Sequence, residues 1–207
     1  MFTSFRKNQY FIHWWHGTDA LKLDTYPPTD QWTWYIRIKL ERILHKIIEP
    51  IIREHWVVDE VLTKHLYNFG IPGDKIKVFH APLNYNQIYK KQPHAGFNIL
   101  YYFPRADKNL TYKRWKYGKD IFDHTLTHTN QLHINWIVVD GSQDLSSILP
   151  IVDIYVRPSR HDGYPRLVKE CELNDIPVYY PFGSGVEPSV QSMLNFIEVE
   201  FAKRICS

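Results

Sequence analysis

The chain has 207 residues, of which 44% are hydrophobic and 15% aromatic, so it can bury the core of one large domain or two small ones. Its formal charge of +3 and pI near 8.7 suit phosphate ligands or an anionic surface, and are too small to indicate a nucleic-acid-binding protein. The two cysteines, Cys171 and Cys206, are too few for a disulfide framework. The sequence has no signal-like segment and no apolar run long enough to span a membrane, so we predict a cytoplasmic protein.

Near the N-terminus an apolar, aromatic run leads into a polar loop. Residues 10–15 are predicted to form a strand, and His16, Gly17 and Asp19 follow it. Residues at the carboxyl ends of strands commonly bind ligands in open α/β sheets. His13 and His16 also lie three apart, so ring stacking among the tryptophans and half of a metal site remain alternative interpretations.

The next periodic segment predicts a helix over residues 35–51. Its apolar residues recur at helical spacing with Arg37, Lys39, Arg42 and Lys46 around them, and Pro50 should end or kink the helix. Such a stripe usually covers a sheet. A basic amphipathic helix can also contact an anionic membrane, and both interpretations stay open.

A strand, a helix and a second strand are predicted over residues 55–59, 60–69 and 75–79, with Gly70 ending the helix. The polar residues that follow lack apolar periodicity, so we predict an interdomain linker there. The resulting organisation is an N-terminal domain of residues 1–84, a linker of residues 85–96 and a C-terminal domain of residues 97–207.

The second domain is predicted to open with a strand over residues 97–103, a basic loop, a helix over residues 117–127 and a strand over residues 134–139. Asp140 and Gly141 follow that last strand. On the predicted helix, His124 and His128 have metal-ligand spacing, but no glutamate accompanies them, so we interpret them as surface residues.

The most informative stretch is residues 152–180, which predicts a strand, a polar loop, a helix and a second strand. Pro165 suits a first helical position, and a loop that runs through Gly163 into a helix presents free amides to an anion. Asp162 and Glu170, eight positions apart, flank this loop. Carboxylates repel phosphate and accept hydrogen bonds from hydroxyls, so the pattern predicts a ligand with a diphosphate between diols, such as a nucleotide sugar.

This stretch resembles the acid-x7-acid motif of retaining glycosyltransferases of the GT-B class, especially glycosyltransferase family 4. Asp162 stands in place of the usual first glutamate, Glu170 is the second acid, and Ile176-Pro177-Val178 matches the strand that follows. Further matches are the H-G-x-D that begins at His16 and the boundary segment Gly70-Ile71-Pro72. The resemblance covers about residues 10–185, and roughly the first half of the family's N-terminal domain, with its glycine-rich loop, has no counterpart.

The resemblance implies an α/β fold of two Rossmann-like parallel-sheet domains that face a cleft, with a reduced N-terminal domain. It implies retaining transfer of a sugar from a nucleotide-diphosphate sugar to an acceptor glycan, lipid or protein, without a cofactor. Because the chain contains no D-x-D sequence, we also predict that no metal is needed. The implied catalytic residues are His16, Arg105, Asp162 and Glu170. The implied substrate-binding residues are Gly17, Asp19, Lys108, Lys119, Asp140, Gly141, Arg160, His161, Gly163, Tyr164 and Arg166.

The choice among the lysines is open, since Lys113 and Lys116 fit the diphosphate as well as Lys108 and Lys119 do. A non-catalytic nucleotide- or sugar-binding module is the main alternative function: the missing segment favours it, whereas both acids and Arg105 favour an enzyme. Peripheral membrane contact and a homodimer that completes the reduced domain are further expectations. Nucleic acid is not expected as a partner, because no RNP-like or helix-turn-helix pattern is present.

Overall fold

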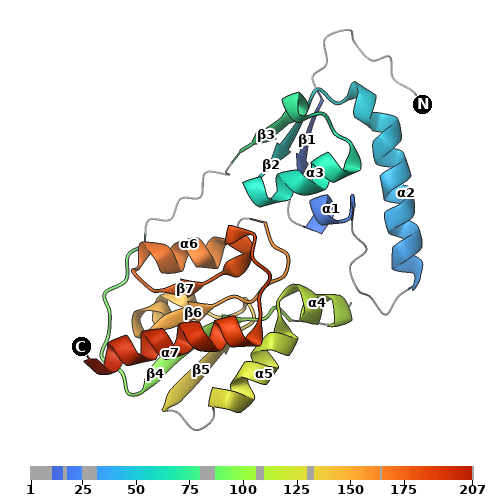
Figure 1. The fold of residues 1–207 in the computed structure, drawn as a ribbon. Helices are drawn as coiled ribbons and strands as arrows, with labels where there is room; N and C mark the ends of the chain where they lie inside the picture. The colour runs from blue at the N-terminus through green and yellow to red at the C-terminus, as the bar shows by residue number, and fades with distance from the viewer. Residues whose placement is uncertain are drawn as a thin grey trace. The chain divides into compact units, whose positions relative to one another are not determined.

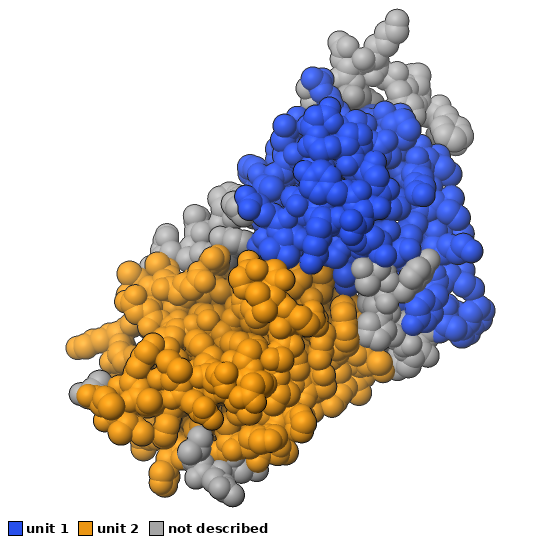
Figure 2. All heavy atoms as spheres, in the orientation of Figure 1, with its two compact units in different colours: residues 1–27, 31–81 blue, residues 28–30, 82–207 orange. Residues whose placement is uncertain are grey.

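A computed structural model describes residues 11–15, 18–24, 32–79, 87–105, 110–129, 133–163 and 165–206, without the side chains of Thr18 and Asp19. The chain divides into two compact units, residues 1–27 with 31–81 (unit 1) and residues 28–30 with 82–207 (unit 2) (Figure 2). Each unit holds one parallel sheet with helices, so the α/β class predicted from the sequence is confirmed (Figure 1). Within the described ranges, no helix is both long and apolar enough to cross a bilayer.

Unit 1 is built on a three-stranded parallel sheet in the order β1-β2-β3. The strands are β1 (Ile12–Trp15), β2 (Glu54–Val57) and β3 (Ile76–Val78), and Val57 pairs with Trp15 on one side and Val78 on the other. The helices are α1 (Thr18–Leu21), α2 (Trp32–Ile48) and α3 (Thr63–Phe69), with 3-10 turns η1 (Glu49–Ile51), η2 (Glu60–Leu62) and η3 (Gly73–Lys75). As predicted, α3 ends at Gly70, which takes the left-handed conformation with φ 94°.

The predicted helix around residues 35–51 exists as α2, and Pro50 lies in the 3-10 turn that follows it. Of the residues in α2, all of which the structure describes, Ile38 is the one that is buried. The expectation that its apolar stripe covers a sheet therefore holds for one narrow face. Most of the stripe is exposed.

Unit 2 is built on a four-stranded parallel sheet in the order β5-β4-β6-β7. Its strands are β4 (Phe97–Tyr102), β5 (Ile134–Val139), β6 (Ile154–Val156) and β7 (Val178–Tyr179). Its helices are α4 (Leu110–Lys116), α5 (Lys119–Thr129), α6 (Arg166–Leu173) and α7 (Val190–Cys206), with 3-10 turns η4 (Leu145–Ser147), η5 (Leu149–Ile151) and η6 (Pro181–Ser184).

Both faces of the unit 2 sheet are buried, as expected for a parallel sheet (Figure 1). Successive residues of β4 serve opposite faces: Ile99 and Tyr101 pack with α5 and α7, whereas Leu100 packs with α6. Because β4 lies between β5 and β6, the chain crosses from one side of β4 to the other. That topology opens a crevice at the carboxyl ends of β4 and β6, where open α/β sheets bind ligands.

One predicted helix boundary differs from the structure. Pro165 is the N-cap of α6, with φ −74° and ψ 110°, so its backbone is still extended and the helix begins one residue later than predicted. Residues 87–96, which fall in the predicted linker, belong to unit 2 and hydrogen-bond within it: the amide of Gln92 donates to the Pro150 carbonyl at 2.9 Å, and Lys91 Nζ donates to the Val152 carbonyl at 2.5 Å.

Candidate functional site

A pocket of about 500 Å³ opens at the carboxyl ends of the strands of unit 2. Pockets of this size accommodate small molecules and cofactors. Its lining combines aromatic and aliphatic walls with a few charged groups. The described residues that line it all come from unit 2: Gln87, Tyr89, Tyr102, Tyr117, Val139, Gly141, Gln143, Asp144, Leu145, Ser146, Arg157, Arg166, Leu167 and Glu170.

Arg157, which directly follows β6, is the buried cation of this pocket. Its Nε and Nη2 both donate to Oδ2 of Asp162, Nε at 2.7 Å, and its Nη1 donates to the hydroxyl of Tyr155 at 2.9 Å. The guanidinium carbon lies 5.5 Å from the ring centroid of Tyr102 and 5.6 Å from that of Tyr117. Arg157 is thus held in one geometry from several sides, which removes most of the rotamer entropy that ligand binding would otherwise cost.

The pair of Arg157 and Asp162 is ionised. Burial raises the pKa of Asp162, but the charges of Arg157 and Lys116, with hydrogen bonds from Arg157 and from the Gly163 amide, outweigh it and leave that pKa below its ordinary value. Burial lowers the pKa of Arg157, and its interactions with Tyr155 and Asp162 raise it by more. Burial also raises the pKa of Tyr117 to about 12, so this ring is neutral at physiological pH.

Glu170 lies on α6 and lines the same pocket as Arg157. Its Oε1 accepts a hydrogen bond of 2.8 Å from Nε of Arg166, one turn earlier, which also lines the pocket. The Gly163 amide, expected to face a bound anion, instead donates to Oδ1 of Asp162 at 2.9 Å. Both oxygens of Asp162 are therefore engaged inside the protein, whereas Glu170 faces the pocket.

After β5, the chain places Gly141 in the pocket lining with φ +95°. The neighbouring Asp140 accepts hydrogen bonds from the hydroxyl and amide of Ser142, and the hydroxyl bond is the largest cause of its lowered pKa. Arg105 lies beside it, with Nε 3.2 Å from Oδ2 of Asp140, and its side chain is 86% exposed. Arg105 is not among the lining residues.

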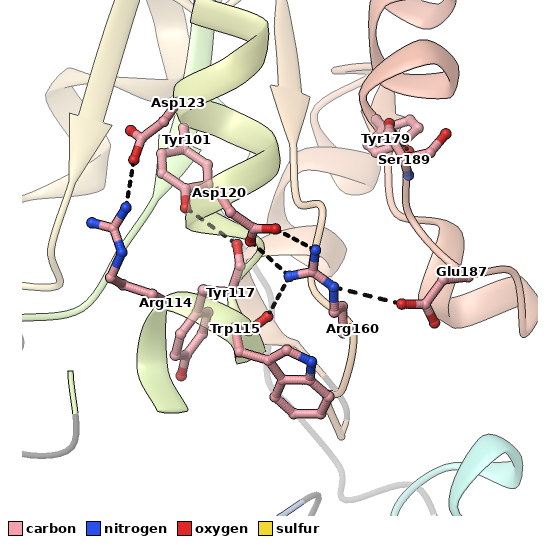
Figure 3. A network of polar contacts seen from close by, with 10 residues as sticks. All are labelled: Tyr101, Arg114, Trp115, Tyr117, Asp120, Asp123, Arg160, Tyr179, Glu187 and Ser189. Carbon is pink, nitrogen blue, oxygen red and sulfur yellow. Dashed lines mark hydrogen bonds and ion pairs between the residues drawn. The ribbon is translucent and has the colours of Figure 1, made fainter. Parts of the chain in front are cut away.

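Arg160 braces the loop after β6 against α4 and α5 (Figure 3). Its Nη1 donates to the Trp115 carbonyl at 3.0 Å and to Oδ1 of Asp120 at 2.7 Å, Nη2 donates to Oδ2 of Asp120 at 2.5 Å, and Nε lies 3.6 Å from Glu187 (Figure 3). Its own amide donates to the Lys116 carbonyl at 2.9 Å. These contacts occupy the guanidinium and fix the loop that carries Arg157 and Asp162.

Two other residues that we expected to bind substrate have packing contacts in unit 2. The buried ring of His161 lies 5.4 Å from that of Phe182. Lys119 pairs with Asp123, and its Nζ lies 5.0 Å from the ring centroid of Phe122. Of the sequence-predicted site residues, His16, Gly17, Lys108 and Tyr164 lie outside the described residues, as does the side chain of Asp19.

Sequence reasoning missed Arg157, Tyr102 and Tyr117. Arg157 carried a local signal, since a cation placed directly after a buried β-branched strand reaches the carboxyl edge of the sheet. Among the lysines left open, Lys116 has its Nζ 5.3 Å from the ring centroid of Tyr117 and lowers the pKa of Asp162. No local signal marks the two tyrosines, which come from β4 and from the turn before α5.

No family model matches the sequence, and no curated protein is significantly similar to it. Solved structures are similar in fold. The structure of Anabaena Alr3699/HepE in complex with UDP-glucose aligns with a TM-score of 0.55 at 14% identity, over 76% of this chain and 56% of HepE. TarM aligns with a TM-score of 0.59 at 12% identity, over 95% of this chain and 44% of TarM. A mutant of S. aureus TarM in complex with Fondaparinux, alpha-GlcNAc-glycerol and UDP aligns with a TM-score of 0.52 at 12% identity, over 83% of this chain and 36% of that one.

The fold matches the GT-B fold of these structures. At these identities the similarity concerns the arrangement of strands and helices. The chain spans about half the length of HepE and of TarM. The cleft between two domains, family 4 membership and the domain boundaries stay predictions.

Proposed function

We propose that this chain binds a nucleotide-diphosphate sugar in the unit 2 pocket and transfers the sugar, with retention of its configuration and without a metal ion, to a glycan, lipid or protein acceptor. The observation that carries this proposal is Arg157: a buried, ionised cation at the switch point of a parallel sheet, in the same pocket as Glu170. A diphosphate and a neighbouring diol are the ligand groups that a fixed guanidinium and a carboxylate recognise.

In the proposed complex, the diphosphate lies against Arg157 and a ribose diol donates to Glu170. The rings of Tyr102 and Tyr117, which flank Arg157, provide flat walls for the rest of the nucleotide. When the sugar leaves, negative charge grows on the diphosphate. A cation already held in place stabilises that charge without reorganisation, and one such donor is typically worth about 3 to 4 kcal/mol.

Asp162 takes a different role in this proposal from the one that the motif implies. Its two carboxylate oxygens accept from Arg157 and from the Gly163 amide. We therefore assign Asp162 to holding Arg157 in position, and no longer to contacting the transferred sugar. Arg105, which the resemblance implies as a catalytic residue, becomes an exposed secondary contact of the diphosphate.

The hydrogen bonds that occupy both oxygens of Asp162 also favour a second candidate function, a non-catalytic module that binds a nucleotide sugar. If Asp162 does not contact the sugar, this chain lacks one of the two acids that the resemblance assigns to donor binding. The two functions share the pocket and differ in turnover alone.

The complexes of the similar structures support a uridine nucleotide as the first donor to try, because HepE was solved with UDP-glucose and a TarM mutant with UDP. Calorimetric titration of wild type with UDP, UDP-glucose, GDP and ADP should give saturable binding to at least one of them. Glu170→Ala should weaken that binding roughly tenfold or more, since it removes a charge-assisted hydrogen bond. Glu172→Ala is the matched control, because Glu172 lies on the same helix and pairs with Lys169 outside the pocket. Binding to none of the nucleotides would contradict both functions.

Turnover separates the enzyme from the binding module. We expect release of free nucleoside diphosphate, a product anomer that matches the donor anomer, and an unchanged rate in EDTA. Binding without turnover, for every donor and with lipid, glycan and protein acceptors supplied, would leave the binding module alone. A rate abolished by EDTA and restored by a divalent cation would contradict the metal-independent mechanism.

A further inference from the structure

Helix α2 carries apolar residues on two opposite sides. Its inner face packs on the rest of unit 1 through Trp34, Ile38 and His45: Nζ of Lys22 lies 4.8 Å from the ring centroid of Trp34, Ile38 is buried, and the ring centroid of His45 lies 4.9 Å from that of Trp15. An α-helix turns by about 100° per residue, so a residue two positions further along faces almost the opposite way. Ile36, Leu40 and Ile47 each follow one of the three inner residues by two positions, so they lie on the opposite side of the helix.

The outer face of α2 consists of Trp32, Ile36, Leu40, Ile43, Leu44 and Ile47. These six side chains are each between 47% and 71% exposed. They follow one another along about 22 Å of helix at 1.5 Å per residue. Soluble monomers seldom expose a continuous apolar surface of this kind, so the outer face marks an interaction surface.

Cations border the outer face on both sides. By helical position, Arg37 lies next to Leu44 on one side, and Lys39 and Lys46 lie next to Trp32 and Ile43 on the other. Glu41 is the one acid in α2, and its carboxylate accepts from Nε of Arg37 at 2.7 Å and lies 3.7 Å from Nζ of Lys22. The border of the outer face is therefore net positive.

We propose that the outer face of α2 docks on an anionic lipid surface, with the helix lying in the plane of the interface. A helix with an apolar stripe bordered by cations can lie in the membrane interface, where its apolar side chains are buried among the acyl chains and its cations contact lipid phosphates. Trp32 at the start of the helix suits the headgroup layer, where amphipathic rings concentrate. A second copy of α2 suits this face less well, because it would bring two cationic borders together with no uncommitted acid between them.

Vesicle co-sedimentation of the full chain tests the proposal. Wild type should bind vesicles of phosphatidylcholine with phosphatidylglycerol, and bind vesicles of phosphatidylcholine alone more weakly. Leu40→Ser/Ile43→Ser/Ile47→Ser and, separately, Lys39→Glu/Lys46→Glu should each reduce binding to the anionic vesicles roughly tenfold or more. The matched control is Val199→Ser/Ile205→Ser, which removes two exposed apolar side chains from α7 and should bind as wild type does.

Three outcomes would overturn the proposal: no binding of wild type to anionic vesicles, unchanged binding of both α2 variants, or a dimer in sedimentation equilibrium that the triple variant abolishes. The last would assign the outer face to a second copy. Since the substituted side chains are exposed, thermal unfolding of the variants should stay close to wild type; the lysine variant loses one contact, that of Lys46 Nζ with the Phe69 ring, whose centroid lies 5.6 Å away. Docking does not rest on the pocket, so nucleotide affinity measured on the same variants should be unchanged, and failure of one proposal is distinguishable from failure of the other.

Discussion

At the scale of single residues, the decisive interaction is the buried pair of Arg157 and Asp162. A buried ion pair is stable as long as both partners are present, because each compensates the desolvation of the other. Here the pair also leaves the guanidinium at the pocket surface. The same two side chains thus contribute to folding and to the proposed ligand contact, and mutation can separate these contributions.

We expect Arg157→Ala to lower the free energy of unfolding by about 3 to 5 kcal/mol, because it leaves the Asp162 carboxylate buried without its cation. Arg157→Met/Asp162→Leu should recover most of this loss, since apolar side chains of similar volume replace the pair, yet it should bind no nucleotide. Urea unfolding and calorimetry on both proteins check this. Wild-type nucleotide affinity in the double variant would show that Arg157 is not a ligand contact.

Another residue-scale effect concerns His55 on β2. Its buried Nδ1 accepts a hydrogen bond of 3.1 Å from Nε1 of Trp15, and burial, followed by the neighbouring His13, lowers the pKa of His55 to about 4. The folded state therefore holds a neutral ring, whereas the unfolded chain takes up a proton near the ordinary value of 6.5. The contribution of His55 to the free energy of unfolding is therefore fully present above pH 6.5 and is lost as the pH falls towards 4.

For wild type we expect the free energy of unfolding to fall by up to about 3 kcal/mol between pH 6.5 and 4 on account of His55. His55→Gln keeps an acceptor for Trp15 and does not titrate, so its stability should depend less on pH over this interval. Thermal unfolding of both proteins at several pH values measures the difference. Equal pH dependence would mean that other groups cause the acid loss of stability.

At the scale of elements, the turn between α4 and α5 supports the loop after β6. Gly118 in this turn has φ +61°, and a Cβ built on it would lie 1.9 Å from the Pro158 carbonyl oxygen. Next to this close approach lie the bonds of Arg160 to Trp115 and Asp120 (Figure 3). The loop that carries Arg157 and Asp162 is thus positioned by backbone contact as well as by side chains.

Gly118→Ala should lower the free energy of unfolding by about 2 to 4 kcal/mol, because the added methyl group both clashes and strains the backbone, and it should weaken nucleotide binding by displacing the loop. Gly185→Ala is the control, since Gly185 also has a positive φ, +73°, but a Cβ added to it would have no atom within 4 Å. Its cost should be about 1 to 2 kcal/mol with unchanged binding. Equal effects of the two substitutions would show that the close approach is unimportant.

At the scale of the molecule, the two proposed functions, donor binding and lipid docking, belong to different units. Every described residue that lines the pocket belongs to unit 2, and this unit has buried cores on both faces of its own sheet. The outer face of α2 belongs to unit 1. Donor binding and lipid docking are therefore assigned to different parts of the chain.

We expect a fragment of residues 82–207 to fold and to bind the preferred nucleotide within about threefold of the affinity of the full chain, since it keeps its own core and every described residue that lines the pocket. Circular dichroism and calorimetry test the fragment. It should not transfer sugar, because it lacks His16, one of the residues that the resemblance implies to be catalytic. A folded fragment without affinity would show that unit 1 contributes to the donor site.

The sequence by itself determined what depends on neighbours along the chain. The strand before Arg157, the turn at Gly163, the end of α3 at Gly70 and the eight-residue spacing of Asp162 and Glu170 all follow from local patterns, because backbone preferences and helical spacing act over a few residues. Periodicity also predicted α2. It could not say which of the two apolar sides is buried, since both repeat with the same period.

Only the tertiary structure decided which side chains meet. Tyr102, Tyr117 and Arg157 come from three separate segments and converge because β4 and β6 are neighbours in the sheet. Asp162, Arg160 and His161 belong to one loop, yet each has different partners: Arg157 after β6 for Asp162, residues of α4 and α5 for Arg160, and Phe182 of η6 for His161. Burial and pairing depend on contacts between residues distant in sequence, so the proposed exchange of roles between Arg105 and Arg157 could be inferred only once these contacts were known.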